Sequence, residues 1–172
     1  SAIGAQLSVA YVFAGTGNYA GASASGTITV TVVRQVTNPF TDVPSGAYYE
    51  EAVLWAVGEG VTSGTSATTF TPDGSCTRAQ AVSFLWRIAG RPAPKTGTMP
   101  FADVKTGAYY YDAVLWAMEN GITYGTSAVA FSPDATCTRA QIVSFLYRYV
   151  GSPAVQSGAV FSDVGASAYY AD

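Results

Sequence analysis

The sequence repeats with a period of 61 residues, and this repetition constrains the fold more than any other feature of the chain. The segment Phe40-Thr41-Asp42-Val43 returns 61 residues later as Phe101-Ala102-Asp103-Val104. A third copy opens at Phe161-Ser162-Asp163-Val164, one residue short of the same step. Repeats of this kind stack so that neighbouring units complete one another's core. We therefore expect a repeat architecture from Phe40 onward.

Each copy contains two segments with helical periodicity. In the first segment apolar residues recur at i, i+3, i+4, i+7 and i+8, as in a helix that is buried on one face. These residues are Tyr49, Ala52, Val53, Ala56 and Val57, and then Tyr110, Ala113, Val114, Ala117 and Met118. The second segment carries Val82, Phe84, Leu85 and Ile88, and then Val143, Phe145, Leu146 and Tyr149. Glycines that can end a helix follow the four segments, at Gly60, Gly90, Gly121 and Gly151. The sequence predicts a mainly α fold of helix–loop–helix repeats.

A long loop joins the two helices expected in each copy. It ends at Phe70-Thr71-Pro72-Asp73 and at Phe131-Ser132-Pro133-Asp134. Pro followed by Asp is a turn signal, and we expect each Phe to pin the loop to the core. For Asp42, Asp103 and Asp163 we expect a cap on the following helix, with a ligand contact as the alternative.

The second helix of each copy begins with an unusual cation. Thr77 and Gln80, like Thr138 and Gln141, have the spacing of a capping box. Between them, Arg78 and Arg139 place a positive charge in the first turn, against a macrodipole that favours anions there by about 0.3–1 kcal/mol. Because this choice occurs twice, we expect both arginines to bind an anion outside the helix. Arg87 and Arg148 lie in the last turn, where a cation suits the dipole, and we interpret them as structural.

The two cysteines, Cys76 and Cys137, occupy equivalent repeat positions. Equivalent positions in stacked repeats are rarely close enough to bridge, although the sequence does not exclude a disulfide. We interpret each cysteine as a small buried apolar residue before the N-cap.

Residues 1–37 differ in kind from the repeats. The stretches 6–13 and 25–33 are rich in β-branched and aromatic residues, and the turn-rich segment 14–21 separates them. We expect two antiparallel strands, followed by a linker over residues 34–38. The stretch 11–33 resembles the closing strands of bacterial immunoglobulin-like domains, of which it would be about a third.

Composition excludes several classes of function. With eight Lys and Arg against eleven Asp and Glu, the net charge is −3, which argues against general nucleic-acid binding. No apolar stretch approaches the 18 residues of a membrane span, so we expect no membrane insertion. Histidine is absent, which excludes a Cys/His zinc site and a Ser-His or Cys-His catalytic pair; we expect no metal and no cofactor.

The ordered motifs resemble the S-layer homology (SLH) repeat. They are Phe-x-Asp-Val, a Trp in an amphipathic helix, Gly, Phe-x-Pro, Thr-Arg-Ala-Gln and Phe-Leu-x-Arg. The likeness covers residues 40–90, 101–151 and the opening of a third repeat at Phe161. It divides the chain into the β segment 1–37, repeats at 38–92 and 93–153, and a truncated third repeat at 154–172. The family motif usually ends in Thr-Arg-Ala-Glu, where this chain has Gln80 and Gln141.

The resemblance implies a partial pseudo-threefold bundle and an extracellular, non-catalytic anchor on the bacterial cell wall. Its implied ligand is pyruvylated secondary wall polysaccharide, held in grooves between repeats. An arginine can grip the pyruvyl carboxylate by two hydrogen bonds. Further candidates to line the grooves are Trp55, Trp116, Tyr124, Gly64 and Gly125, together with the capping residues. Core packing is the alternative for both tryptophans. With the third repeat truncated, we expect the second repeat to expose an apolar flank that can pair with another chain.

Two other classes of function are alternatives to a cell-wall anchor. A glycan-processing enzyme needs two carboxylates in a cleft, and apart from the repeat aspartates no acidic pair sits at matched positions. A structural or adhesive stalk for protein–protein contact is the stronger alternative. Retention of solubilised wall polymer would separate the anchor from the stalk.

Overall fold

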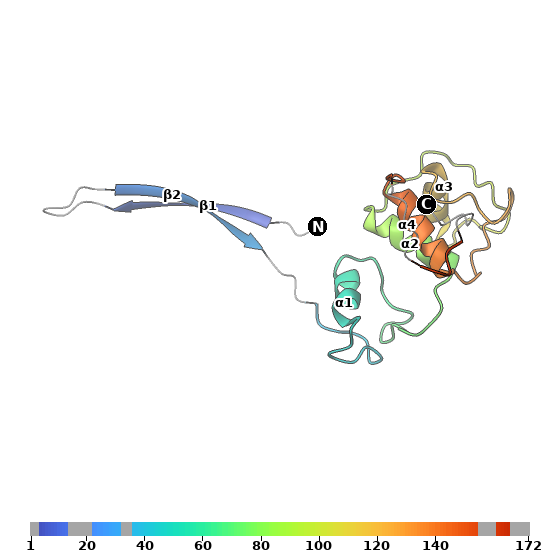
Figure 1. Ribbon diagram of the computed structural model, residues 1–172, viewed down its shortest axis with the longest axis horizontal. Coiled ribbons are helices and arrows are strands. Elements are labelled where there is room, and N and C mark those ends of the chain that lie inside the picture. Colours follow the sequence, from blue (N-terminus) through green and yellow to red (C-terminus); the bar gives the residue numbers. More distant parts are fainter. Residues whose placement is uncertain (1–3, 14–21, 32–35, 155–160, 166–172) are drawn as a thin grey trace, which may run out of the picture. The chain divides into compact units, whose positions relative to one another are not determined.

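The computed structural model describes residues 4–13, 22–31, 36–154 and 161–165 (Figure 1). The chain divides into two compact units, Ser1–Thr37 and Asn38–Asp172, and each is described here by itself. Within the described residues, no helix has both the length and the apolar character needed to cross a bilayer.

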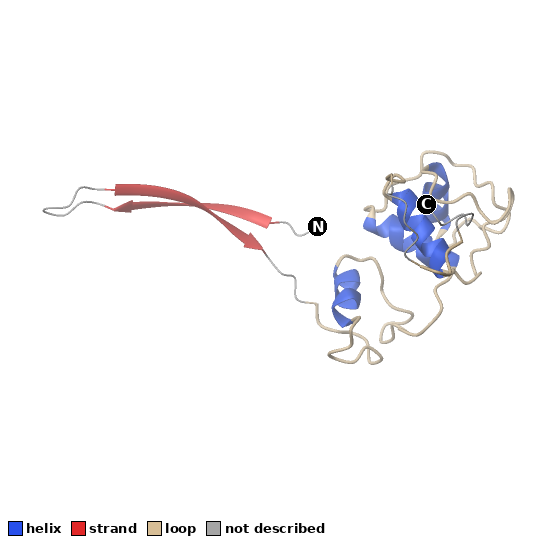
Figure 2. Ribbon diagram, in the orientation of Figure 1, coloured by secondary structure: helices blue, strands red, loops and turns tan. Residues whose placement is uncertain are grey.

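The first unit contains a two-stranded antiparallel ribbon. Strand β1, Gly4–Phe13, pairs with strand β2, Ala22–Thr31, from Gly4 opposite Thr31 to Phe13 opposite Ala22 (Figure 2). The prediction of two antiparallel strands is confirmed, with both strands beginning earlier than expected. The connector at 14–21 lies outside the described residues, and the immunoglobulin-like origin of the ribbon stays a prediction.

The second unit contains four helices: α1 Glu50–Gly58, α2 Arg78–Ile88, α3 Tyr111–Glu119 and α4 Arg139–Tyr149. Both capping boxes are confirmed, since the N-cap threonine and the third helical residue, glutamine, exchange hydrogen bonds in α2 and in α4. The four glycines expected to stop the helices all have φ between +68° and +87°, which a glycine adopts without strain. The predicted helix–loop–helix repeats are therefore present.

The main core forms between repeats. Helix α2 of the first repeat packs against α3 and α4 of the second (Figure 1). Val82, Leu85, Val114 and Phe131 meet in this core, each 5% exposed or less. Phe131 thus pins its loop as predicted, and α2 is buried by the repeat that follows it.

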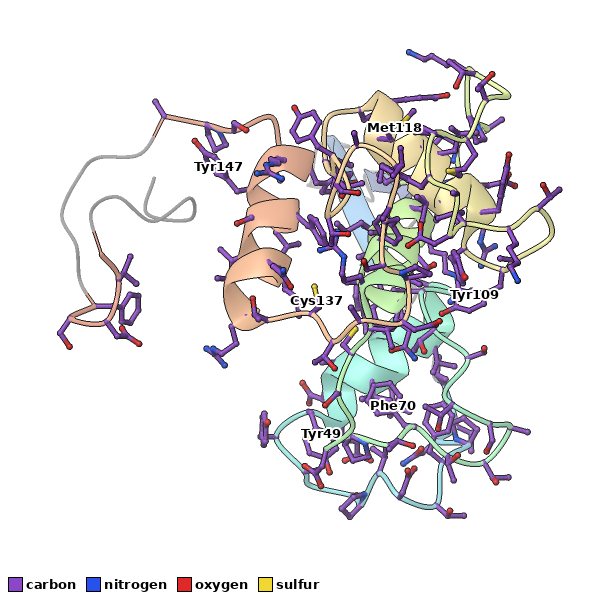
Figure 3. All side chains as sticks on the ribbon, turned by 90° about the vertical axis from the view of Figure 1, so that its right-hand side faces the viewer. Tyr49, Phe70, Tyr109, Met118, Cys137 and Tyr147 are labelled. Carbon is purple, nitrogen blue, oxygen red and sulfur yellow. The ribbon has the colours of Figure 1, made fainter. Side chains whose placement is uncertain are left out.

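Helix α1 belongs to a separate and smaller cluster. Val53 packs there with Phe40 and Val43, and the partly buried Tyr49 and Phe70 cover them (Figure 3). No helix among the described residues covers α1 as α2 covers α3. The two repeats therefore share a sequence pattern but differ in burial.

Asp42 and Asp103 do not cap the helices that follow them, and our prediction of a cap for these two was wrong; for Asp163, residues 166–172 lie outside the described part of the chain. Both helices that follow begin without a side-chain cap. Asp42 instead accepts hydrogen bonds from the backbone N–H groups of Phe70 and Thr71, at 2.8 and 2.7 Å. Asp103 accepts the same two bonds, at 2.8 and 2.7 Å, from the equivalent loop of the second repeat. A carboxylate has room for both donors, so it ties the start of each repeat to the end of its loop.

Candidate functional site

The loop and second helix of the first repeat enclose a groove of about 590 Å³, which we call the first groove. Tyr109 of the second repeat closes one side of it, beside α2 (Figure 3). Gln80, Ser83 and Arg87 line it from α2. Its loop contributes hydroxyl groups from Thr62, Ser63, Thr65, Thr71 and Ser75. The first groove is therefore rich in hydroxyl and amide groups, with an arginine and a phenol at its edge.

The second repeat forms an equivalent groove of about 370 Å³, which we call the second groove. Eight of its lining residues are the repeat equivalents of residues that line the first groove: Thr123, Tyr124, Gly125, Thr126, Gln141, Ser144, Phe145 and Arg148. Of these only Tyr124 differs in type, since Ser63 is its equivalent in the first groove, and the second groove also contains Arg78 from the first repeat. The same chemistry thus appears twice, with an additional arginine in the second groove.

Arg78 reaches out of its own repeat, but it is buried rather than presented to solvent. Its side chain is 4% exposed, and Nε donates to the carbonyl oxygen of Phe131 at 2.9 Å. The guanidinium carbon lies 4.9 Å from the centre of the Phe131 ring and 5.4 Å from that of Phe145. Arg78 therefore joins the two repeats and forms part of the wall of the second groove.

Arg139, at the equivalent position on α4, is exposed and lines neither groove. The difference arises because the repeat that follows Arg78 supplies a loop and two rings for it. Among the described residues, nothing equivalent covers Arg139.

Arg87 and Arg148 are groove residues that the sequence reasoning classed as structural only. Arg87 Nη1 donates to the carbonyl of Val61 at 2.9 Å, and Arg148 Nη1 to that of Ile122 at 3.4 Å. The Arg148 guanidinium also lies over the ring of Tyr124, 5.6 Å from its centre. A sequence signal was available: Gln80, Ser83 and Arg87 have the i, i+3, i+7 spacing of one helix face.

The other predicted site residues fall into three groups. Gln80 and Gln141 line the grooves, while Thr77 and Thr138 act as N-caps. Gly64 and Gly125 line the grooves with φ of +81° and +80°. Neither tryptophan lines either groove: Trp116 lies in the core, 7% exposed, and Trp55 is 55% exposed on α1.

The glycines shape the groove walls because no side chain fits there. A Cβ added to Gly125 would lie 2.5 Å from the carbonyl oxygen of Ala130 and equally close to the ring of Phe101. Gly64 is equally confined by Thr69 and Phe40. These positions need glycine for packing as well as for their positive φ.

The charged side chains that line the two grooves are all positive. The residues that line them include Arg87 in the first groove and Arg78 and Arg148 in the second, and no Asp or Glu. Burial raises the pKa of Tyr109, so this phenol at the first groove stays neutral well above pH 7. The described residues contain no group of three or more Cys, Asp or Glu side chains arranged to hold a metal ion. The grooves are therefore suited to a neutral or anionic polar ligand.

The family model for the S-layer homology domain matches residues 39–82 and 100–143, slightly more than half of the chain. The chain belongs to the S-layer homology domain family. Both matched SLH segments begin at the Phe-x-Asp-Val motif and run into the second helix of their repeat, so they contain the loops of both grooves.

Relatives of this SLH chain include surface-layer proteins. It is 36% identical over 99 residues to a surface-layer 125 kDa protein of Lysinibacillus sphaericus, covering 58% of this chain and 8% of the relative. It is 36% identical over 110 residues to an endoglucanase of Bacillus sp. strain KSM-635, covering 64% and 11%. An S-layer protein of Bacillus thuringiensis subsp. finitimus is 28% identical over 129 residues, covering 71% and 16%. The chain spans less than a fifth of the length of these relatives, and its SLH repeats are a cell-surface anchoring module associated with the cell wall.

Proposed function

We propose that the SLH repeats hold this protein on the bacterial wall by binding acidic, pyruvylated secondary wall polysaccharide in the two grooves. The observation that carries the proposal is the charge of the groove walls. Both grooves contain arginine and neither is lined by a carboxylate, although the chain as a whole has a net charge of −3. Grooves that carry positive charge and no negative charge favour an anion.

The proposed contacts follow from the residues that line the grooves. A pyruvyl ketal presents a carboxylate on a sugar ring, and an arginine binds a carboxylate with two parallel hydrogen bonds. In the second groove Arg148 supplies the guanidinium, and Tyr124, 70% exposed, offers a ring face to the sugar. Gln141 and Thr126 provide amide and hydroxyl partners for sugar hydroxyl groups. In the first groove Arg87 is the equivalent of Arg148, and Tyr109 of the second repeat supplies the aromatic ring.

Binding by Arg139 stays a prediction that the grooves do not support directly. In this proposal Arg78 contacts the ligand and also holds the two repeats together, because its Nε donates to the Phe131 carbonyl. Removing Arg78 would therefore perturb the fold as well as binding. Arg148 offers the sharper test, since its bond to Ile122 is long, at 3.4 Å.

The experiment is calorimetric titration of the chain with solubilised acidic wall polysaccharide. We expect Arg148→Gln to weaken binding roughly 10–100-fold, since a hydrogen bond to a charged group contributes about 1.5–3 kcal/mol. Arg148→Lys should retain part of the affinity, because Lys keeps the charge but not the planar fork. Lys105→Gln removes the same charge from an exposed residue outside both grooves and should leave affinity unchanged.

Two outcomes would reject this assignment. Equal affinity for the polymer before and after mild-acid removal of its pyruvyl groups would show that the carboxylate is not recognised. Equal losses from Arg148→Gln and Lys105→Gln would show that only overall charge matters. Unchanged binding by every groove variant, together with capture of a protein partner, would favour the adhesive stalk.

Two further parts of the proposal concern catalysis and the association of two copies of this chain. The anchoring module performs no catalysis of its own in this proposal. Self-association is proposed through the exposed apolar side chains of α4 and its C-cap, namely Val143, Leu146 and Val150, which are 45–63% exposed. Their equivalents on α2 include the buried Val82 and Leu85, which α3 covers. Sedimentation velocity should show a concentration-dependent dimer that Leu146→Ser abolishes; a monomer at all concentrations would exclude it.

A further inference from the structure

The two cysteines face one another across the junction between the repeats. Thr77 and Thr136 form an isolated antiparallel bridge. Hydrogen bonds on both sides fix the register: the Cys137 amide donates to the Cys76 carbonyl at 2.9 Å, and the Arg78 amide to the Ala135 carbonyl at 2.9 Å. In this register Cys76 stands directly opposite Cys137.

The register places the thiols within reach of each other. Directly opposed residues of an antiparallel pair carry their side chains on the same face, with Cα atoms about 4.5–5.5 Å apart. That separation falls inside the range of about 4.4–6.8 Å found for disulfides. The sequence expectation that equivalent repeat positions lie too far apart does not hold here, because the segments that precede α2 and α4 run antiparallel to each other.

We infer that Cys76 and Cys137 form an intramolecular disulfide that joins the first repeat to the second. They are the only two cysteines of the chain, and both are free thiols in this structure. The SLH module is located on the cell surface, where disulfides form and persist. An unconnected Cys76 thiol, which is partly exposed, would be open to oxidation there.

The bond forms by exchange with a low-molecular-weight disulfide as oxidant. Cys76 reacts first, because it is partly exposed whereas Cys137 is 8% exposed. The Cys76 thiolate attacks one sulfur of the oxidant and expels the other as a thiolate. The Cys137 thiolate then attacks the Cys76 sulfur and expels the second. Two protein thiols become one disulfide, and the oxidant leaves as two thiols that carry the two electrons and two protons.

The local cost of forming the bond is small. Cys76 Sγ gives up a weak contact with the Thr77 carbonyl oxygen at 3.5 Å. Burial raises the pKa of both thiols, which slows the exchange at neutral pH without opposing its product. The bond would secure the junction that presents Tyr109 to the first groove and Arg78 to the second.

The test is to oxidise the folded chain with oxidised glutathione at a few micromolar protein and map the product. Trypsin cuts after Arg34, Arg78, Lys105 and Arg139, so the disulfide links peptides 35–78 and 106–139. We expect the linked peptide from a monomer, with loss of both thiols. The melting temperature should rise by roughly 5–15 °C on oxidation, as expected for a closed loop of this length.

Two control variants test whether the rise in melting temperature comes from the disulfide itself. In Cys76→Ser the melting temperature should not respond to oxidant or reductant. A double change of Cys76 and Cys137 to Val keeps an apolar side chain at both positions and should melt near the reduced chain. Two thiols that persist after prolonged oxidation, or a disulfide that appears only between chains, would overturn the inference.

Discussion

Replacing Arg78 tests the central structural conclusion, that a cation at a helix entrance joins two repeats. Arg78→Ala removes the bond from Nε to the Phe131 carbonyl, and hydrogen bonds from charged groups contribute about 1.5–3 kcal/mol. It also removes two ring contacts, each contributing about 0.5–1 kcal/mol. Part of this loss is offset because a buried charge no longer has to be desolvated. We expect a net destabilisation of about 3 kcal/mol.

The repeat provides a matched control. Arg139→Ala changes the same residue type at the equivalent position, inside the same capping box, but on an exposed surface. The unfavourable helix-dipole contribution is removed in both variants, so the difference between them isolates the tertiary contacts. We expect Arg139→Ala to change the free energy of unfolding by no more than about 0.5 kcal/mol.

Urea unfolding followed by circular dichroism measures both variants. With an m-value of about 2 kcal/mol/M, the midpoint for Arg78→Ala should fall by roughly 1.5 M while that for Arg139→Ala stays in place. Equal shifts for the two variants would refute the reasoning. So would an Arg78→Met variant more stable than the parent, because desolvation of the charge would then outweigh its contacts.

Three further predictions concern the loops and helices. Gly125→Ala should lower the free energy of unfolding by more than about 3 kcal/mol, because the added Cβ would lie 2.5 Å from a carbonyl oxygen. Gly107→Ala should lower it by only about 1–2 kcal/mol, because Gly107 has φ of +83° but open space around it. The denaturant midpoints of the two variants test this difference. Hydrogen bonds from loop amides lower the pKa of Asp42 below its ordinary value of 3.8, so its contribution is present above that pH and is lost as the pH falls below it. Asp42→Asn should therefore lower the melting temperature more at pH 7 than at pH 2, and a constant difference would contradict this. Trp116→Ala should lower the free energy of unfolding by about 3–5 kcal/mol, because Trp116 is only 7% exposed, and Trp55→Ala should lower it clearly less, because Trp55 is 55% exposed. Equal losses of stability would mean that α1 is covered in solution.

Local structure could be predicted from the sequence because it depends on residues close together in the chain. The capping boxes at Thr77 and Thr138 need only a hydroxyl and an amide three residues apart. The helix stops at Gly60 and Gly121 need only a residue that accepts positive φ. The strand pair of residues 1–37 followed from alternation and turn composition.

The candidate site could be predicted only in part. Residues such as Gln80 and Gly64 were found because a loop must lie beside the helix that follows it. Arg148 was assigned to the helix dipole, because its position in the last turn already explained a cation. Asp42 was assigned to a nearby helix, although its partners lie 28 and 29 residues away.

The sequence by itself determined where α2 and α4 begin, which glycines follow the four helices and that the unit occurs twice. Only the tertiary structure decided that Arg78 is buried while Arg139 is exposed, that Trp116 lies in the core while Trp55 does not, and that the two cysteines stand opposite each other. The physical reason is that local hydrogen bonds and glycine conformation are properties of a single repeat. Burial and contacts between the repeats depend instead on which neighbouring segment covers each repeat. Equivalent residues in the two repeats have different neighbours.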